Sequence, residues 1–329
     1  MGRFLRWCAA LIVLGMIGCA SVVAYLYSQF VNPGPLAGDL IVIVPRGAGV
    51  DAIARLFKSN GIIEEEFPFR LGVRTLGREK PLLAGEYEFP KGVSPREAME
   101  ILQSGKTVVR RLTIPEGLTS AEIIDRLNKT EGLLGAVSIG VADGELLPET
   151  YHFSYGDQRN DLIRRMQVAM RDTLDDLWKR RPNGSPYENA RSLVTMASIV
   201  EKETAKADER PRVAGVFVNR LKIGMRLQSD PTVVYAVTAG KTSFERSLTR
   251  ADLEMASPYN TYVIAGLPPG PIANPGRASL EAALKPAETG DLYFVADGTG
   301  GHAFARTLAD HNRNVARWRA SMKNKPSTE

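Results

Sequence analysis

The sequence predicts an α+β protein that begins with one membrane-spanning helix. Three observations support this fold class: residues 7–27 contain no charged side chain, residues 39–130 alternate short apolar runs with capped helical patterns, and longer helical stripes dominate after about residue 145. Hydrophobic residues make up 44% and charged residues 24% of the 329 residues, which is typical of globular proteins. A chain of this length is expected to form about two domains.

The composition excludes several classes of site and partner. Both cysteines, Cys8 and Cys19, lie near the N-terminus, so the body has no thiol for a disulfide, a zinc ligand or a nucleophile. The histidines at 152, 302 and 311 never stand at the spacing of a zinc site, and there is no phosphate-binding loop. The formal net charge of +5 is too small and too scattered for a nucleic-acid-binding face. We therefore expect no metal, no cofactor and no nucleic acid partner.

Residues 7–27 are predicted to cross a membrane once. Twenty-one residues at about 1.5 Å each match a hydrocarbon core of about 30 Å. Arg3 and Arg6 precede this segment, and the next basic residue is Arg46. The positive-inside rule therefore leaves residues 1–6 as a cytoplasmic tail and places the body on the other side of the membrane.

Two alternative interpretations of this segment fit less well. A cleaved signal peptide has a shorter apolar region and an Ala-x-Ala site, which is missing here. A lipoprotein signal requires a polar stretch after the lipidated cysteine, whereas residues 20–26 after Cys19 are predominantly apolar. The next segment, residues 28–38, contains two prolines and two glycines, and we expect it to be a linker between the anchor and the body.

Between residues 39 and 130, strand-like runs precede helices with clear start signals. Residues 40–44 form an apolar run, and the helical pattern after it ends at Asn60-Gly61. Residues 94–97 and 119–122 have the residue types and spacing of capping boxes, each followed by an apolar helical stripe. We expect small βα units in this part of the chain.

The second half of the chain is predicted to hold longer helices and one hairpin. The expected helices cover residues 161–179, 188–204 and 211–224, and a last helix starts at Thr307. The expected hairpin joins residues 291–296 to residues 302–305 through a turn rich in glycine. This half of the chain contains the residues to which we assign chemistry.

Glu201 is the sequence's best candidate for a catalytic group. The apolar residues Leu193, Ala197 and Val200 repeat at helical spacing, and Glu201 follows on the same side of the helix. A carboxyl group pressed into apolar surroundings has a raised pKa and can hold a proton for a leaving group. Glu203 lies about 200° around the helix and is expected to point elsewhere.

A structural role for Glu201 stays open at this point. A carboxylate near the end of a helix commonly pairs with a basic residue, and Lys202, Lys206 and Arg210 all follow closely. The spacing of residues alone does not decide between an ion pair and a general acid.

Several long consecutive motifs add a family resemblance. They occupy residues 196–204, 216–221, 224–235, 257–262 and 266–276, with shorter matches at 147–151, 301–304 and 307–312. Together they resemble the endolytic murein transglycosylase family, also called YceG-like. The similarity extends from the N-terminal anchor almost to the C-terminus.

The resemblance implies a bacterial inner-membrane enzyme whose body lies in the periplasm. It implies a small LysM-like domain at residues 39–110 and a catalytic domain at residues 111–329. Such enzymes cut the MurNAc-β-1,4-GlcNAc bond within nascent peptidoglycan and leave 1,6-anhydro-MurNAc ends, which terminates strand elongation. The family's catalytic glutamate is taken to correspond to Glu201. The family association also suggests contact with peptidoglycan polymerases, the penicillin-binding proteins.

The residues expected to contact the sugar are amides, aromatics and one further carboxylate. They are Gln228, Asp230, Tyr235, Tyr259, Asn260 and Asn274. Asp230 and Asn274 each precede a proline, so both also fit helix N-caps. Tyr259 is equally compatible with core packing.

Two other functions stay open beside the lyase. A muramidase-type hydrolase would use Glu201 together with Asp230 or Glu209, because ordinary glycosidases need two carboxyl groups. A non-catalytic peptidoglycan-binding scaffold of the cell-wall synthesis machinery would need neither group. A lyase can use one carboxyl group alone, because the 6-hydroxyl of the sugar itself serves as the nucleophile.

Overall fold

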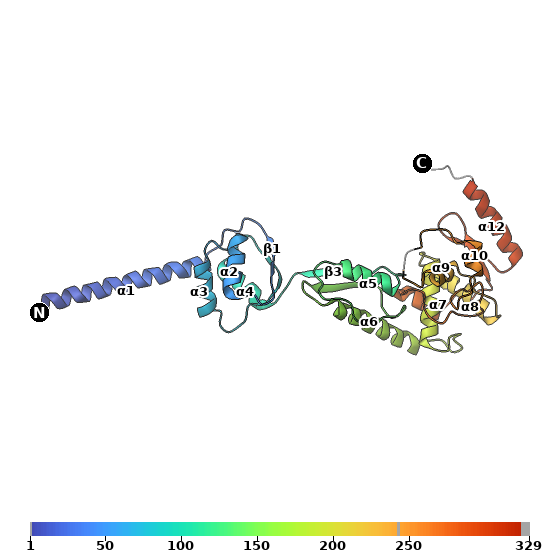
Figure 1. The fold of residues 1–329 in the computed structure, drawn as a ribbon, viewed down its shortest axis with the longest axis horizontal. Coiled ribbons are helices and arrows are strands. Elements are labelled where there is room, and N and C mark those ends of the chain that lie inside the picture. Colours follow the sequence, from blue (N-terminus) through green and yellow to red (C-terminus); the bar gives the residue numbers. More distant parts are fainter. Residues whose placement is uncertain (1, 242–243, 324–329) are drawn as a thin grey trace. The chain divides into compact units, whose positions relative to one another are not determined.

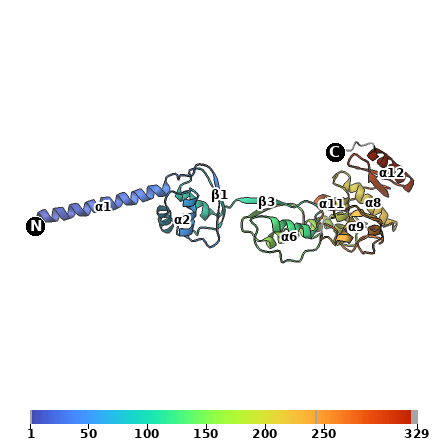
Figure 2. The same cartoon turned by 45° about the horizontal axis from the view of Figure 1, so that its top comes forward.

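The computed structural model describes residues 2–241 and 244–323 and divides into two compact units (Figure 1). Unit 1 comprises Met1–Arg110 and His152–Asp157, and unit 2 comprises Arg111–Tyr151 and Gln158–Glu329. Helices and short strands are mixed in the chain, so the α+β class is confirmed. Figure 2 shows the same elements after a rotation of 45°.

The N-terminal helix α1, Gly2–Val31, is longer than the segment predicted to cross the membrane. Its apolar part, Phe4–Val31, has a mean hydropathy of 2.3 and is long and apolar enough to span a bilayer. The last turn carries Phe30, which is 2% exposed in the core of unit 1. The expected free linker at residues 28–38 therefore differs from the structure: it begins as helix and then packs, with the Gly34 N–H 3.2 Å from the Val93 carbonyl oxygen.

Unit 1 is built around one antiparallel pair of strands and three helices. Strand β1, Leu40–Val44, pairs antiparallel with β2, Gly85–Phe89. The helices are α2 (Val50–Ser59), α3 (Glu66–Thr75) and α4 (Pro95–Ser104). The ring of Phe57 lies in the core of this unit and makes edge-to-face contacts with two other rings. Its centroid is 5.3 Å from that of Phe69 and 5.0 Å from that of Phe89.

The capping boxes predicted from sequence are present. In α4 the Ser94 side chain accepts from the Glu97 N–H and the Glu97 carboxylate accepts from the Ser94 N–H. Thr119 and Glu122 form the same pair at the start of α5, Ser120–Lys129. Each box satisfies backbone donors that the first helical turn cannot pair internally, which explains why these two helices begin where the sequence indicates.

Unit 2 holds most of the helices and the C-terminal hairpin. Its helices, after α5, are α6 (Arg159–Lys179), α7 (Ala190–Glu203), α8 (Arg210–Lys222), α9 (Asp230–Thr238), α10 (Arg250–Glu254), α11 (Arg277–Leu284) and α12 (Leu308–Lys323). Strands β5, Tyr293–Ala296, and β6, His302–Ala305, pair antiparallel as predicted. Helix α7 lies in the core against α8 and α11, and all residues from Leu193 to Val200 are buried.

The strands of the described residues form three separate two-stranded sheets, with the orders β1-β2, β3-β4 and β5-β6. Strands β3, Val109–Thr113, and β4, Thr150–Ser154, are the pair through which the chain passes from unit 1 to unit 2 and back. The βα units expected from sequence do not share one sheet: the strands of the first two units, β1 and β2, pair with each other, and β3 pairs with β4.

Candidate active site

The C-terminal end of α7 brings two carboxyl groups to the edge of the core of unit 2. Asn189 caps the start of the helix by accepting from the Ser192 N–H at 2.9 Å. The buried stretch ends at Val200, whose carbonyl accepts from the Thr204 N–H and closes the helix. Glu201 and Glu203 occupy the last turn, so their surroundings are set by segments other than α7 itself.

Glu201 lies in an ion pair. Its Oε1 is 3.1 Å from Nη2 of Arg210, and its Oε2 accepts from the Gly276 N–H at 2.9 Å. The side chain is only 5% exposed. The ion pair with Arg210 that the sequence left open is present, so the carboxylate of Glu201 is not in purely apolar surroundings, and its catalytic role stays a prediction. The sequence pattern could not show this, because Arg210 and Gly276 reach Glu201 from α8 and from the loop before α11.

Glu116 completes this cluster, which we call the Arg210 cluster: Glu116, Glu201 and Arg210. Nη2 of Arg210 is also 3.2 Å from Oε2 of Glu116. Burial and the negative charge of Glu201 raise the pKa of Glu116, against the opposing charge of Arg210. A Cβ added at Gly276 would come 1.7 Å from Glu116 Oε1, so a larger residue there would displace the Glu116 side chain from the cluster. The cluster joins three segments of unit 2 and has the character of a structural clamp.

The raised pKa that the sequence led us to expect at Glu201 occurs at Glu203. Burial raises the pKa of Glu203 to about 7. The negative charge of Asp230 acts in the same direction, whereas the hydrogen bond from Ser229 opposes it. The Ser229 hydroxyl donates to Oε1 of Glu203 at 2.5 Å. A pKa in this range is the one expected of a group that serves as both general acid and general base near neutral pH.

A network of hydroxyl groups holds Ser229 in place beneath Glu203. The Ser229 N–H donates to Thr261 Oγ1 at 3.0 Å, and Thr232 donates to the Ser229 carbonyl at 2.6 Å. The two threonine hydroxyls lie 2.8 Å apart. Gln228, immediately before, has a φ of 49°, a conformation that a residue other than glycine seldom adopts. Ser229 carries no sequence signal of its own for this contact, although it directly precedes the Asp230-Pro231 pair.

Gln228 and Asp230 are exposed on either side of buried Ser229. Ser229 is the N-cap of α9 and Asp230 is the first residue of the helix, so the cap predicted for Asp230 lies one residue earlier. Oδ1 of Asp230 accepts from the Tyr262 hydroxyl at 2.6 Å. Both of these predicted sugar-contacting residues are exposed and flank Ser229, whose hydroxyl bonds Glu203.

Asn260 and Asn274 are fully buried, and this contradicts their prediction as sugar-contacting residues. The Asn260 amide donates to three carbonyl oxygens at the end of α10. The Asn274 side chain accepts from two backbone N–H groups, including that of Gly144 at 3.0 Å, and donates to the Leu118 carbonyl at 3.0 Å. Their hydrogen-bonding groups are used inside the protein, because each amide satisfies backbone groups of a buried loop.

Tyr235 and Tyr259 lie together in a separate hollow of unit 2. Their ring centroids are 4.7 Å apart, and the Tyr235 hydroxyl donates to Asp143 at 2.6 Å. Together with Arg191 and Lys241 they line a cavity of about 290 Å³. Arg191 lies near the start of α7, twelve residues before Glu203, a distance of about 18 Å along the helix. These two tyrosines are thus displaced from the carboxyl group along α7.

Glu209, the other partner considered for a hydrolase, is bound to His302. Its Oε2 lies 2.7 Å from Nδ1 of His302, and its Oε1 accepts from the His302 N–H at 3.0 Å. Burial alone would raise the pKa of Glu209, but these hydrogen bonds from His302 outweigh it and the pKa is lowered. Within residues 2–241 and 244–323 no group of three His, Cys, Asp or Glu side chains could hold a metal ion.

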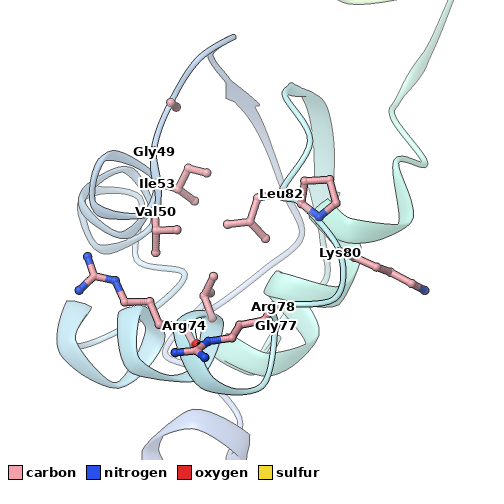
Figure 3. A pocket seen from close by; sticks show the side chains of 11 residues that line it. Gly49, Val50, Ile53, Arg74, Gly77, Arg78, Lys80 and Leu82 are labelled. Carbon is pink, nitrogen blue, oxygen red and sulfur yellow. The ribbon is translucent and has the colours of Figure 1, made fainter.

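Unit 1 contains a cavity of its own, of about 430 Å³ (Figure 3). It lies between the start of α2 and the segment that follows α3. Its floor includes Val50, Ile53 and Leu82, and the basic side chains of Arg74, Arg78 and Lys80 line it as well. Figure 3 shows the two arginines at the lower side of the cavity and Lys80 directed away from it.

Fold and site together define an α+β protein with an N-terminal apolar helix and a partly buried carboxyl group, Glu203, whose pKa is raised. Residues 42–317 match the YceG-like family, and the chain belongs to this family, as its motifs predicted. The chain is 34% identical over 313 residues to the endolytic murein transglycosylase of Bacillus subtilis (strain 168), an alignment that covers 86% of this chain and 85% of the relative.

Two further comparisons agree with this assignment. The chain is 31% identical to the endolytic murein transglycosylase of Streptococcus pneumoniae serotype 2 (strain D39) in an alignment of 319 positions that covers 83% of this chain and 57% of that longer protein. The crystal structure of a yceG-like protein from Listeria monocytogenes has 32% identity and a TM-score of 0.51, covering 84% of this chain and 99% of that chain.

Proposed function

We propose that the chain is an endolytic murein transglycosylase, a lyase that cuts peptidoglycan glycan strands, and that Glu203 is its acid and base. The relatives' names support the activity. One observation supports the residue: Glu203 is the carboxyl group at the end of α7 whose pKa is raised, to about 7, while Glu201 beside it is ion-paired.

The proposed reaction uses Glu203 twice. The protonated carboxyl group gives its proton to the departing glycosidic oxygen as the bond to the anomeric carbon breaks. The resulting carboxylate then takes the proton of the sugar's own 6-hydroxyl as that oxygen bonds to the anomeric carbon. The products are a free 4-hydroxyl and a 1,6-anhydro end, no water is consumed, and Glu203 returns to its protonated form. An intramolecular nucleophile makes a second catalytic carboxylate unnecessary.

Ser229, Gln228 and Asp230 support this role of Glu203. The Ser229 hydroxyl orients the carboxyl group, and Gln228 and Asp230 offer exposed polar groups to the sugar. Tyr235 and Tyr259 form a more distant aromatic surface for the same strand. Glu201 is assigned a positioning role: with Arg210 it fixes the end of α7 against the Gly276 loop.

The position of Asp230 near Glu203 favours one alternative function, a hydrolase. Its charge is close enough to raise the pKa of Glu203, so a hydrolase with Asp230 as the second carboxylate is the competing function. Mass spectrometry of peptidoglycan digested by the full chain in detergent separates the two. We expect anhydro ends, which are one water molecule lighter than the reducing ends that a hydrolase would leave. Intact strands would support a non-catalytic scaffold and contradict the proposal.

The same proposal places the protein in the membrane. We propose that α1 is an uncleaved single-pass anchor with a cytoplasmic N-terminus and a periplasmic body, rather than a signal sequence. We propose residues 39–110 as a LysM-like domain, with the basic-lined cavity of unit 1 as a site for glycan and its carboxylates, and residues 111–329 as the catalytic domain. Penicillin-binding proteins, which build the strands that would be cut, are the proposed partners.

A further inference from the structure

Helix α3 of unit 1 exposes large apolar side chains beside the membrane helix. Phe67 is 55% exposed, Leu71 is 38% exposed and Leu76, the C-cap of α3, is 60% exposed. Phe67 and Leu71 are four residues apart and lie on the same side of the helix, and Leu71 and Leu76 line one hollow together with α1. Contiguous exposed apolar groups of this kind mark interaction sites. We call these three residues the α3 apolar face.

The position of α3 along α1 sets its depth in the membrane. The apolar part of α1, Phe4–Val31, has 28 residues and a length of about 42 Å, about 12 Å more than the hydrocarbon core requires. Its last turns therefore reach the headgroup region. Helix α3 packs against these turns and crosses the end of α1 (Figure 1). Val23, Leu26, Leu71 and Leu76 line one apolar hollow of about 260 Å³.

The charges around α3 suit a lipid surface. The segment 74–80 carries three basic side chains and one acidic one. The acidic residues at the other end of α3 are largely neutralised, since Glu65 pairs with Lys58 at 2.9 Å and Glu66 lies 3.9 Å from Arg70. Apolar residues beside basic ones on a short helix are typical of helices that lie in the membrane interface.

We infer that α3 lies in the outer interface of the bilayer that α1 crosses. The α3 apolar face sits at the boundary between headgroups and acyl chains, and Lys80, whose side chain is directed away from the cavity of unit 1, contacts lipid phosphates. This inference rests on the proposed role of α1 as an anchor. It makes unit 1 a module seated on the membrane surface instead of one held only by a helix.

The test uses the full chain in vesicles of phosphatidylcholine and phosphatidylglycerol at 3:1. In a chain with Cys8→Ser and Cys19→Ser, single cysteines are introduced as Phe67→Cys, Leu71→Cys or Leu76→Cys and labelled with an environment-sensitive fluorophore. Lipids with nitroxides on the headgroup or the acyl chain report depth by quenching. Ile41→Cys is the matched control, because Ile41 is 51% exposed in the same unit on β1, and Leu14→Cys within α1 reports the anchor.

We expect strong quenching at positions 67, 71 and 76 by nitroxides near the headgroup, deep quenching at position 14, and none at position 41. Quenching at position 14 without quenching at the three α3 positions would overturn the inference and leave the anchor intact. Labels on α3 that are shielded from water but not reached by lipid nitroxides would also overturn it, because they would indicate a protein contact. Failure at position 14 would contradict the anchor itself.

Discussion

Glu201 and Glu203 lie two residues apart at one end of α7, yet their surroundings are opposite. Glu201 faces donors: a guanidinium at 3.1 Å and a backbone N–H at 2.9 Å. Glu203 accepts a hydrogen bond from the Ser229 hydroxyl, and desolvation of its carboxylate raises its pKa to about 7. The comparison shows that the segments packed over a carboxyl group set its pKa more than the apolar stripe of its own helix does.

The largest expected effect is the loss of activity when the carboxyl group of Glu203 is replaced by an amide. Glu203→Gln should lower the rate of glycan cleavage by about 10²–10⁴-fold, because an amide of nearly the same shape cannot donate the proton or take it back. Release of anhydro-ended fragments, quantified by mass spectrometry, measures this rate. Glu201→Gln is the matched control, and it should keep cleavage within about tenfold of the wild type. Equal losses in the two variants would erase the distinction between them.

The Arg210 cluster should matter for stability. Arg210→Met leaves Glu116 and Glu201 without their shared partner and should lower the free energy of unfolding by about 3–5 kcal/mol. Thermal denaturation in detergent, followed by circular dichroism, measures the loss. Arg180→Met is a suitable control, because the Arg180–Asp176 pair is exposed and should contribute less than about 1 kcal/mol. Similar melting temperatures in both variants would speak against a structural clamp.

The pH dependence of cleavage should report Glu203 and its two neighbours. The raised pKa predicts that activity falls as the pH rises through about 7, because the proton donor is then ionised. Ser229→Ala removes a hydrogen bond that lowers this pKa, so the alkaline limb should move up by about one pH unit.

Asp230→Asn should move the same limb in the opposite direction, because it removes a negative charge that raises the pKa of Glu203. Rates of cleavage between pH 5 and 9 test both substitutions in one series. Shifts of the same sign in the two variants would exclude Glu203 as the titrating group. Loss of all cleavage in Asp230→Asn, at every pH, would instead favour the two-carboxylate hydrolase.

The smallest effect is expected in the aromatic hollow. Tyr259→Ala removes one ring of the pair that lines the cavity near the start of α7 and should raise KM for glycan strands by roughly 2–10-fold, with little change in kcat. Steady-state kinetics on strands of defined length measure it. Tyr155→Ala, in unit 1, controls for the loss of an aromatic ring elsewhere. A fall in kcat without a change in KM would assign Tyr259 to the chemistry.

Local sequence signals predicted the elements that depend on local interactions. The capping boxes at Ser94 and Thr119, the limits of α6 and the β5-β6 hairpin all follow from residue types a few positions apart. Helix α3 was missed because Pro68 and Gly72 interrupt its pattern. The structure explains both: Pro68 lies in the first turn, and a Cβ at residue 72 would collide with the ring of Phe30 at 2.3 Å.

From the sequence, the candidate site could be located only as far as the C-terminal end of α7. The sequence named Arg210 as a possible partner of Glu201, but Gly276 and Ser229, which contact Glu201 and Glu203, come from segments 75 and 26 residues away and carried no local signal. For the same reason Asn260 and Asn274 could not be told from sugar-binding amides, since their partners are backbone groups of other loops.

The central claim is that Glu203 holds a proton near neutral pH, and infrared difference spectroscopy during a pH titration tests it directly. The wild type and Glu201→Gln should both lose a protonated carboxyl band with a midpoint near pH 7, and Glu203→Gln should lack that band. A band that persists in Glu203→Gln and disappears in Glu201→Gln would contradict the assignment and return the role to Glu201.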